Sequence, residues 1–217
     1  MQENSHSLKR RIFGLDNKFM RASAKIFDLM FLNVLFIASC LPIVTIGPAI
    51  VSLYQMTNKL REGITVSIGR EYFQAMKGNM KQGIQLGLLS SFVGLSLFLN
   101  SKIFVSMQHP ISSTLQMVTY GIAFIIILVS LYAFQISSTF TSTCAQVIKN
   151  AFFLSFLNLK NSFFLFMTIV PVIFLILYSQ LTMLLTLSIL LFIGCSVIAS
   201  IQTMILSPVF EKYRNEN

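Results

Sequence analysis

An uncharged stretch from Leu29 to Asn58 constrains this chain more than any other feature of its sequence. As one straight helix it would run about 45 Å, whereas the hydrocarbon core of a bilayer is about 30 Å thick. Near its centre lies the octet Leu41-Pro42-Ile43-Val44-Thr45-Ile46-Gly47-Pro48. Each proline removes a backbone donor and disfavours helical geometry in the residue before it. The sequence therefore predicts a broken membrane segment, with a helix over about 24–41 and a shorter one over about 48–60.

The composition explains where the rest of the chain must lie. Hydrophobic residues make up 55% of the 217 residues and charged residues only 11%, against about 25% in a soluble domain. We expect one transmembrane domain over 29–210, preceded by a basic segment at 1–28 and followed by a short tail at 211–217. The net charge is +9, and the basic residues that produce it flank the apolar spans. The positive-inside rule therefore explains the charge better than binding to a nucleic acid would.

The remaining uncharged runs predict the other elements of an all-α, polytopic transmembrane helix bundle. Further spans are expected over about 82–101, 115–136, 162–178 and 182–206. Two amphipathic helices, over 59–81 and 144–160, are expected to lie at the membrane surface. The basic face of the first carries the interfacial residues Arg70, Lys77 and Lys81.

Small and hydroxylated residues give two further site hypotheses. Gly83, Gly87 and Ser91 recur at four-residue spacing, which favours close helix packing within the chain or, alternatively, a dimer contact. The hydroxyl-rich run 137–143 either packs against neighbouring helices or lines a polar pathway. The candidate residues for such a pathway are Asn33, Thr45, Ser138 and Thr141.

The distribution of basic residues predicts a topology with a cytoplasmic C-terminus. The same rule places the N-terminus in the cytoplasm only if the broken segment turns back on itself as a hairpin. A single kinked crossing is the alternative, and the sequence leaves both open. The sequence also contains a short internal repeat, because Val51-Ser52-Leu53-Tyr54 recurs as Val129-Ser130-Leu131-Tyr132. The two repeats have the same orientation in the membrane only if the broken segment forms a hairpin.

The residues give no indication of catalysis. We find no clustered metal ligands, no paired acids within the spans and no phosphate-cradling glycine loop, so we expect neither an enzyme nor a cofactor. Cys40, Cys144 and Cys195 are far apart in the sequence, and we expect them to be packing thiols.

Three patterns in the first half of the chain resemble the YesL family of bacterial multi-pass membrane proteins. They are Asn33-Val34-Leu35-Phe36, the run from Cys40 through the octet to Ala49, and the basic segment Phe73–Gly83. The resemblance implies a bacterial plasma membrane and an association with carbohydrate uptake systems, although the function of that family is unsettled. It favours an accessory or assembly subunit that binds other membrane proteins. A small stand-alone transporter or channel is the alternative.

Overall fold

The computed structural model describes residues 18–64, 67–106 and 110–215. Throughout these residues the backbone forms helices joined by short turns, which confirms the predicted all-α bundle. Within them, five segments are long and apolar enough to cross a bilayer: Ala22–Ser39, Met80–Ser106, Ile111–Thr139, Leu159–Tyr178 and Gln180–Tyr213.

The elements follow one another with few intervening residues. In chain order they are α2 (Lys18–Ser39), the 3₁₀ turn η1 (Ile43–Thr45), α3 (Ile46–Arg61), α4 (Ile68–Gly78), α5 (Met80–Ser106), α6 (Pro110–Thr139), α7 (Cys144–Leu157), α8 (Leu159–Met167), α9 (Val170–Tyr178), α10 (Gln180–Ile189), the π-helical segment η2 (Leu190–Gly194) and α11 (Cys195–Asn215).

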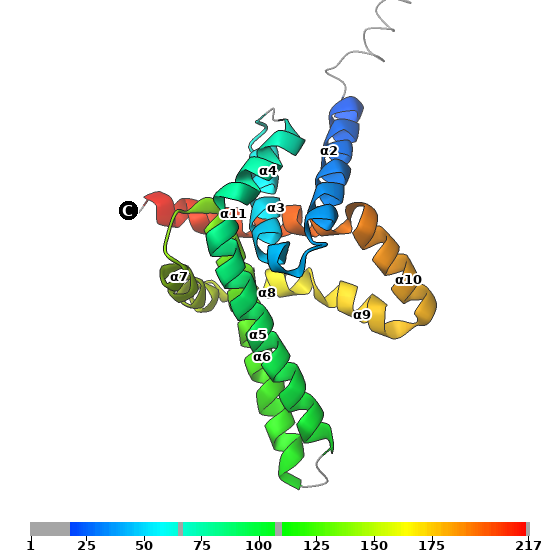
Figure 1. Cartoon of the computed structure of the whole chain (residues 1–217), viewed down its shortest axis with the longest axis vertical. Helices are drawn as coiled ribbons and strands as arrows, with labels where there is room; N and C mark the ends of the chain where they lie inside the picture. The colour runs from blue at the N-terminus through cyan, green and yellow to red at the C-terminus, as the bar shows by residue number, and fades with distance from the viewer. Residues whose placement is uncertain (1–17, 65–66, 107–109, 216–217) are drawn as a thin grey trace, which may run out of the picture.

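The short helix α3 forms the centre of the molecule (Figure 1). Nine of its sixteen residues are buried, and it contacts α2, α4, α5, α6 and α11. At about 24 Å it is shorter than a bilayer core, and its apolar residues pack against protein. It is therefore a core helix around which the longer helices are arranged.

The octet reverses the direction of the chain between α2 and α3 (Figure 1). The helix α2 ends at Ser39 and α3 begins at Ile46, so the break is centred on Pro42. The Thr45 hydroxyl donates to the carbonyl oxygens of Ser39, at 2.6 Å, and Pro42, at 2.7 Å. Pro48 lies in the first turn of α3, where a missing N–H costs nothing, and α3 therefore starts before the expected position 48.

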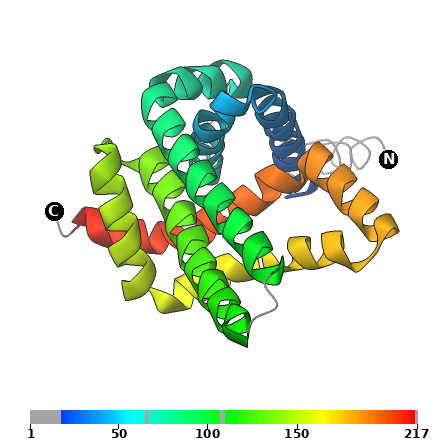
Figure 2. The same cartoon turned by 60° about the horizontal axis from the view of Figure 1, so that its bottom comes forward.

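Two helical pairs extend away from this centre (Figures 1 and 2). The long helices α5 and α6 pack against each other, and so do the shorter α9 and α10. Beyond that mutual contact, α9 contacts α8 and α10 contacts η2. We call α9 with α10, residues 170–189, the outer hairpin.

Each of the two segments expected at the membrane surface, 59–81 and 144–160, is largely helical and contains parts of more than one helix. Residues 59–81 form the end of α3, a loop containing Gly63 at φ 73°, then α4 and the start of α5. The helix α4 packs on α2 and α3, and Tyr72 is fully buried, whereas the neighbouring Phe73 is 50% exposed. Burial raises the pKa of Tyr72 to about 12, which keeps the phenol neutral at physiological pH.

The last two spans are longer than the sequence indicates, and the first of them is interrupted near Pro171, where the proline predicts a kink. The expected helix at 162–178 is divided into α8 and α9 at Thr168 and Ile169, just before Pro171. The expected helix at 182–206 runs instead from Gln180 to Asn215 and contains the π-helical η2. The basic residues before Lys18 and the histidine at 109 lie outside the described residues.

Candidate functional site

The octet and the small-residue face of α5 pack directly against each other. A methyl group added at Gly47 would overlap the carbonyl oxygen of Gly83 and lie 3.0 Å from the Cα atom of Gly87. A methyl group at Gly83 would lie 2.6 Å from the backbone of Pro48. Two features that the sequence indicates separately, the octet and the α5 glycines, are therefore the two sides of one backbone contact. Ser91, the third residue of that spacing, is exposed.

Asn33 makes the most extensive set of long-range hydrogen bonds in the described chain. Its Nδ2 atom donates to the carbonyl oxygens of Leu190, at 2.9 Å, and Leu191, at 2.7 Å, while its Oδ1 atom accepts from the Ser196 amide at 2.9 Å. The carboxamide is thus inserted into the backbone of the last span at η2. A side chain inserted into a helical ladder bends the helix, and α10 and α11 meet at an angle here (Figure 2).

A second buried polar cluster joins α3 to the last span. The Tyr54 hydroxyl donates to Gln202 Oε1, and Gln202 Nε2 donates to the Thr168 hydroxyl at 2.9 Å. One turn further along, the hydroxyls of Thr57 and Thr203 lie 3.1 Å apart. Gln202 is not among the residues predicted from the sequence, although an isolated carboxamide in an otherwise apolar run is a signal for such a contact.

A cavity of about 490 Å³ lies where α6 ends and α7 begins. We call it the polar cavity. Its wall includes the whole hydroxyl-rich run 137–143 and the carboxamides of Gln55, Asn79, Gln82 and Gln146. The loop of this run is tied to α5, because Gln82 Nε2 donates to the Ser142 carbonyl at 3.0 Å. On the other side, Asn79 Nδ2 donates to Gln55 Oε1 at 2.8 Å.

Charged side chains line a neighbouring cavity of about 260 Å³, which shares Gln55, Ser138, Thr139 and Phe140 with the polar cavity. Lys59 is paired with Glu71 at 2.7 Å, and Arg61 lies 3.8 Å from Glu211. These ion pairs join α3 to α4 and to α11. Most of the positive charge on this rim is therefore balanced within the fold.

A larger cavity, about 660 Å³, lies between α3, α5, α6 and α11. Its wall is mainly apolar, and several of its polar groups bond one another, since Tyr54 donates to Gln202 and the hydroxyls of Ser101 and Tyr120 lie 3.3 Å apart.

The four residues of the predicted polar pathway lie in two separate places. Ser138 and Thr141 line the polar cavity. Asn33 and Thr45 do not line it. The Asn33 side chain instead bonds the backbone of η2, and the Thr45 hydroxyl bonds backbone carbonyls at the octet. Two of the four residues thus line a cavity, and the other two stabilise the backbone through side-chain hydrogen bonds.

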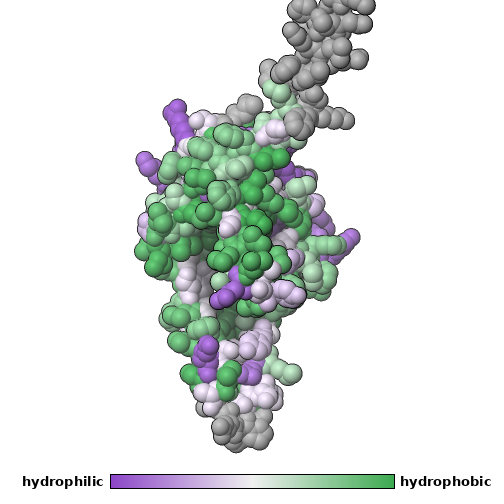
Figure 3. Space-filling model, turned by 90° about the vertical axis from the view of Figure 1, so that its right-hand side faces the viewer, coloured by the Kyte–Doolittle hydropathy of each residue, from purple (hydrophilic) through white to green (hydrophobic). Residues whose placement is uncertain are grey.

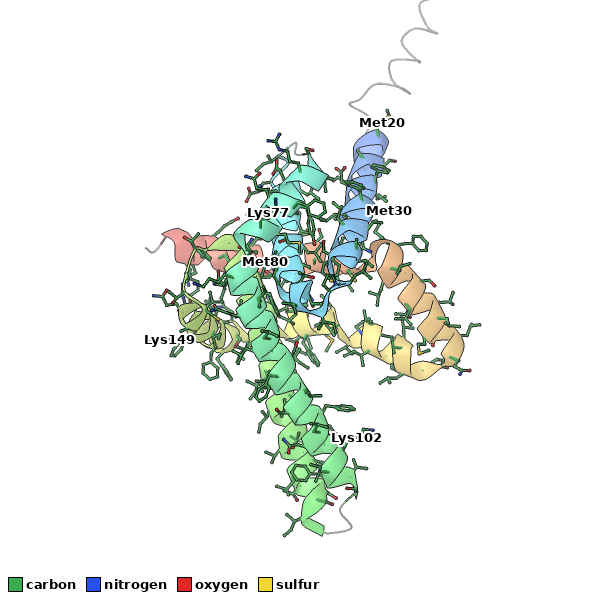
Figure 4. The ribbon with its side chains drawn as sticks, viewed as in Figure 1. Met20, Met30, Lys77, Met80, Lys102 and Lys149 are labelled. Atoms are coloured by element: carbon green, nitrogen blue, oxygen red, sulfur yellow. The ribbon has the colours of Figure 1, made fainter. Side chains whose placement is uncertain are left out.

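The interfacial basic residues Arg70, Lys77 and Lys81 are exposed. Lys77 lies near one end of the molecule and Lys102 near the far end of α5 (Figure 4). The three cysteine thiols are not joined in disulfides. Over residues 18–64, 67–106 and 110–215, no group of three His, Cys, Asp or Glu side chains is placed to hold a metal ion.

Comparisons with known proteins give one match. Residues 29–101 are similar to a family described as "Protein of unknown function, DUF624". This region contains the octet, α3, α4 and the α5 glycines. Neither the curated proteins nor the solved structures contain a match. Together with the five apolar helices, the match shows a multi-pass integral membrane protein with a region similar to an uncharacterised family.

Proposed function

We propose that this chain is a non-catalytic accessory or assembly subunit that binds the transmembrane helices of another membrane protein. The outer hairpin is the observation that carries this proposal. It packs against the rest of the chain mainly through its ends, and large apolar side chains cover it, among them Phe174, Leu177 and Leu181. The face of the molecule that carries it is predominantly hydrophobic (Figure 3).

The resemblance of the octet region to the YesL family supports a bacterial plasma membrane and a carbohydrate uptake or sensing system as the setting. The exposed basic residues Arg70, Lys77 and Lys81, on α4 and at the start of α5, support a cytoplasmic position for that part of the molecule. Partners of this kind contribute the substrate pathway, and this chain contributes a stable framework in the bilayer.

A small stand-alone transporter is the second candidate, and the polar cavity favours it. Two observations weigh against it. Asn33 and Thr45 do not line that cavity, and no Lys, Arg, Asp or Glu occurs between Asn161 and Phe210, where a proton- or sodium-coupled carrier needs ionisable groups.

Gentle solubilisation of the tagged protein from its native membrane tests the proposal. We expect a stoichiometric transporter or sensor subunit to co-purify with the wild-type chain and to be lost from Phe174→Ala. Phe92→Ala on α5 is the matched control, because Phe174 is 61% exposed and Phe92 is 71% exposed. Recovery of the chain alone in several mild detergents, together with solute flux in reconstituted vesicles, would establish the transporter instead.

A further inference from the structure

The wall of the polar cavity contains a buried hydroxyl that the fold leaves unpaired. Ser137 is 5% exposed, and its Oγ atom has no hydrogen-bond partner. A buried hydroxyl without a partner destabilises the fold, because it has lost its hydrogen bonds to water and gained none. Its neighbour Ser138 donates to the Gln135 carbonyl at 2.7 Å, so the local helix geometry does allow such pairing. A group that enters the cavity from outside the chain is therefore a natural partner for Ser137.

The carboxamides of the wall keep both donors and acceptors available. Gln55 and Asn79 use one end of each side chain to bond each other, and Gln82 and Gln146 use one end to hold the backbone of the 137–143 run. The opposite ends are Gln55 Nε2, Asn79 Oδ1, Gln82 Oε1 and Gln146 Nε2. These two donors and two acceptors make no hydrogen bond within the described chain. The cavity thus presents a mixed pattern of donors and acceptors.

We propose that the polar cavity binds a neutral, polyhydroxylated small molecule, a sugar or a polyol. Each hydroxyl of such a ligand both donates and accepts, which matches a wall of carboxamides and hydroxyls. Within the described residues, the wall of this cavity includes no Lys, Arg, Asp or Glu, so a charged ligand would find no counter-charge there. Phe140 adds one apolar surface for the C–H face of a ring.

The size and position of the cavity suit a soluble ligand. Its volume of about 490 Å³ lies within the usual range for small-molecule sites, about 300–1,000 Å³. Gly78 and Gln82 are in its wall, and the adjacent Lys77 and Lys81 are exposed, so the cavity lies at the basic end of the bundle. The inference concerns this chain alone and does not rest on the proposed partner.

Binding to the purified full chain in nanodiscs tests the proposal. The probes are D-glucose, maltose and sorbitol, with glucose 6-phosphate and inorganic phosphate as charged counterparts, and the measurement is titration calorimetry with saturation-transfer NMR. We expect at least one neutral probe to bind saturably in the millimolar range or tighter. Thr141→Trp, an exposed wall residue with no hydrogen bond of its own, is expected to abolish that binding. Ala145→Trp is the matched control, because Ala145 is exposed and outside the wall.

Ser137→Ala separates ligand binding from folding. Because the hydroxyl has no partner in the fold, its removal is expected to leave the melting temperature unchanged or raised, and to weaken binding roughly 2- to 10-fold. Absence of saturable binding by every neutral probe overturns the proposal. So does equal binding by the two tryptophan variants, or binding confined to the phosphate-bearing probes.

Discussion

At the scale of single residues, the fold depends on glycines that allow two backbone segments to pack in direct contact. Gly47 and Gly87 lie so close that a methyl group on Gly87 would come within 2.9 Å of the Cα atom of Gly47. Because these positions have no side chain, the octet packs directly against α5, and α3 lies at the centre of the bundle. Not every glycine of α5 has such a role. A methyl group added at Gly94, also on α5, would meet no atom within 4 Å.

Gly47→Ala is expected to destabilise the protein by about 1–3 kcal/mol or more, because the atom it would strike belongs to the backbone of Gly83 and cannot rotate away. Thermal unfolding in detergent, followed by circular dichroism, measures this change. Gly94→Ala is the control and is expected to be neutral or stabilising, since alanine favours a helix by about 1 kcal/mol over glycine. Equal melting temperatures for the two variants would contradict the contact.

Asn33→Leu is a second residue-scale prediction. The leucine keeps the branched shape of the side chain but leaves the Leu191 carbonyl and the Ser196 amide without the group that bonds them. An unpaired polar group in an apolar setting costs about 1–3 kcal/mol, so we expect a loss of that size. Asn100→Leu, at an exposed position of α5, is the control for the change of residue type. The measurement is again the melting temperature, and an unchanged value for Asn33→Leu would show that η2 does not need the carboxamide.

At the scale of elements, the helices that follow the two repeated tetrapeptides, α4 and α7, have similar ends. Asn79 ends α4 and Asn158 ends α7, and in both cases the side-chain Nδ2 donates to the carbonyl four residues earlier. Tyr54 and Tyr132, the last residues of the repeated tetrapeptides, are both buried with their hydroxyls bonded. The repeat therefore corresponds to similar local structure in two parts of the chain.

Much of the fold follows from the sequence, because uncharged length and proline position are local properties. The bundle, the break at the octet and the kink before Pro171 are of this kind. The role of Asn33 could not be predicted in this way. Its partners lie more than 150 residues away in the sequence, and they are backbone groups, which every residue has. The polar cavity could likewise be predicted only in part from the sequence. The sequence singles out Ser138 and Thr141, but it gives no sign that Gln55 of α3 lies beside them.

Glu71→Gln is the element-scale prediction. It removes the ion pair that joins α3 to α4, in which Lys59 and Glu71 are 34% and 28% exposed. Partly exposed pairs contribute little, so we expect a loss of about 1 kcal/mol or less, which shrinks further at high salt. Melting temperatures at low and high ionic strength measure both effects. A large loss that salt does not reduce would show that Glu71 has a role beyond this pair.

At the scale of the whole molecule, the direction of the octet hairpin determines the topology. The N-terminal end of α2 and the loop before α4 lie at the same end of the molecule (Figure 1). The end of α5, the start of α6 and the turn between α9 and α10 lie away from that end (Figure 1). This arrangement returns the chain after the octet to the side from which it came. If the four later candidate spans each cross the bilayer, we expect the C-terminus on that side as well.

Cysteine labelling in intact cells tests this arrangement. In a chain whose three cysteines are replaced by alanine, we expect Ser23→Cys and Ser67→Cys to be shielded from an impermeant maleimide, and Ser179→Cys to be labelled. All three positions are exposed in the fold, so permeabilised cells should label every variant and serve as the control. The informative comparison is between Ser23 and Ser67. Labelling of Ser23→Cys but not Ser67→Cys would mean that α2 and α3 cross the bilayer together as one kinked span, and the octet would then be a kink in that crossing. Shielding of both would establish the octet as a re-entrant turn, whose backbone groups are satisfied by Thr45 and whose closeness to α5 depends on Gly47.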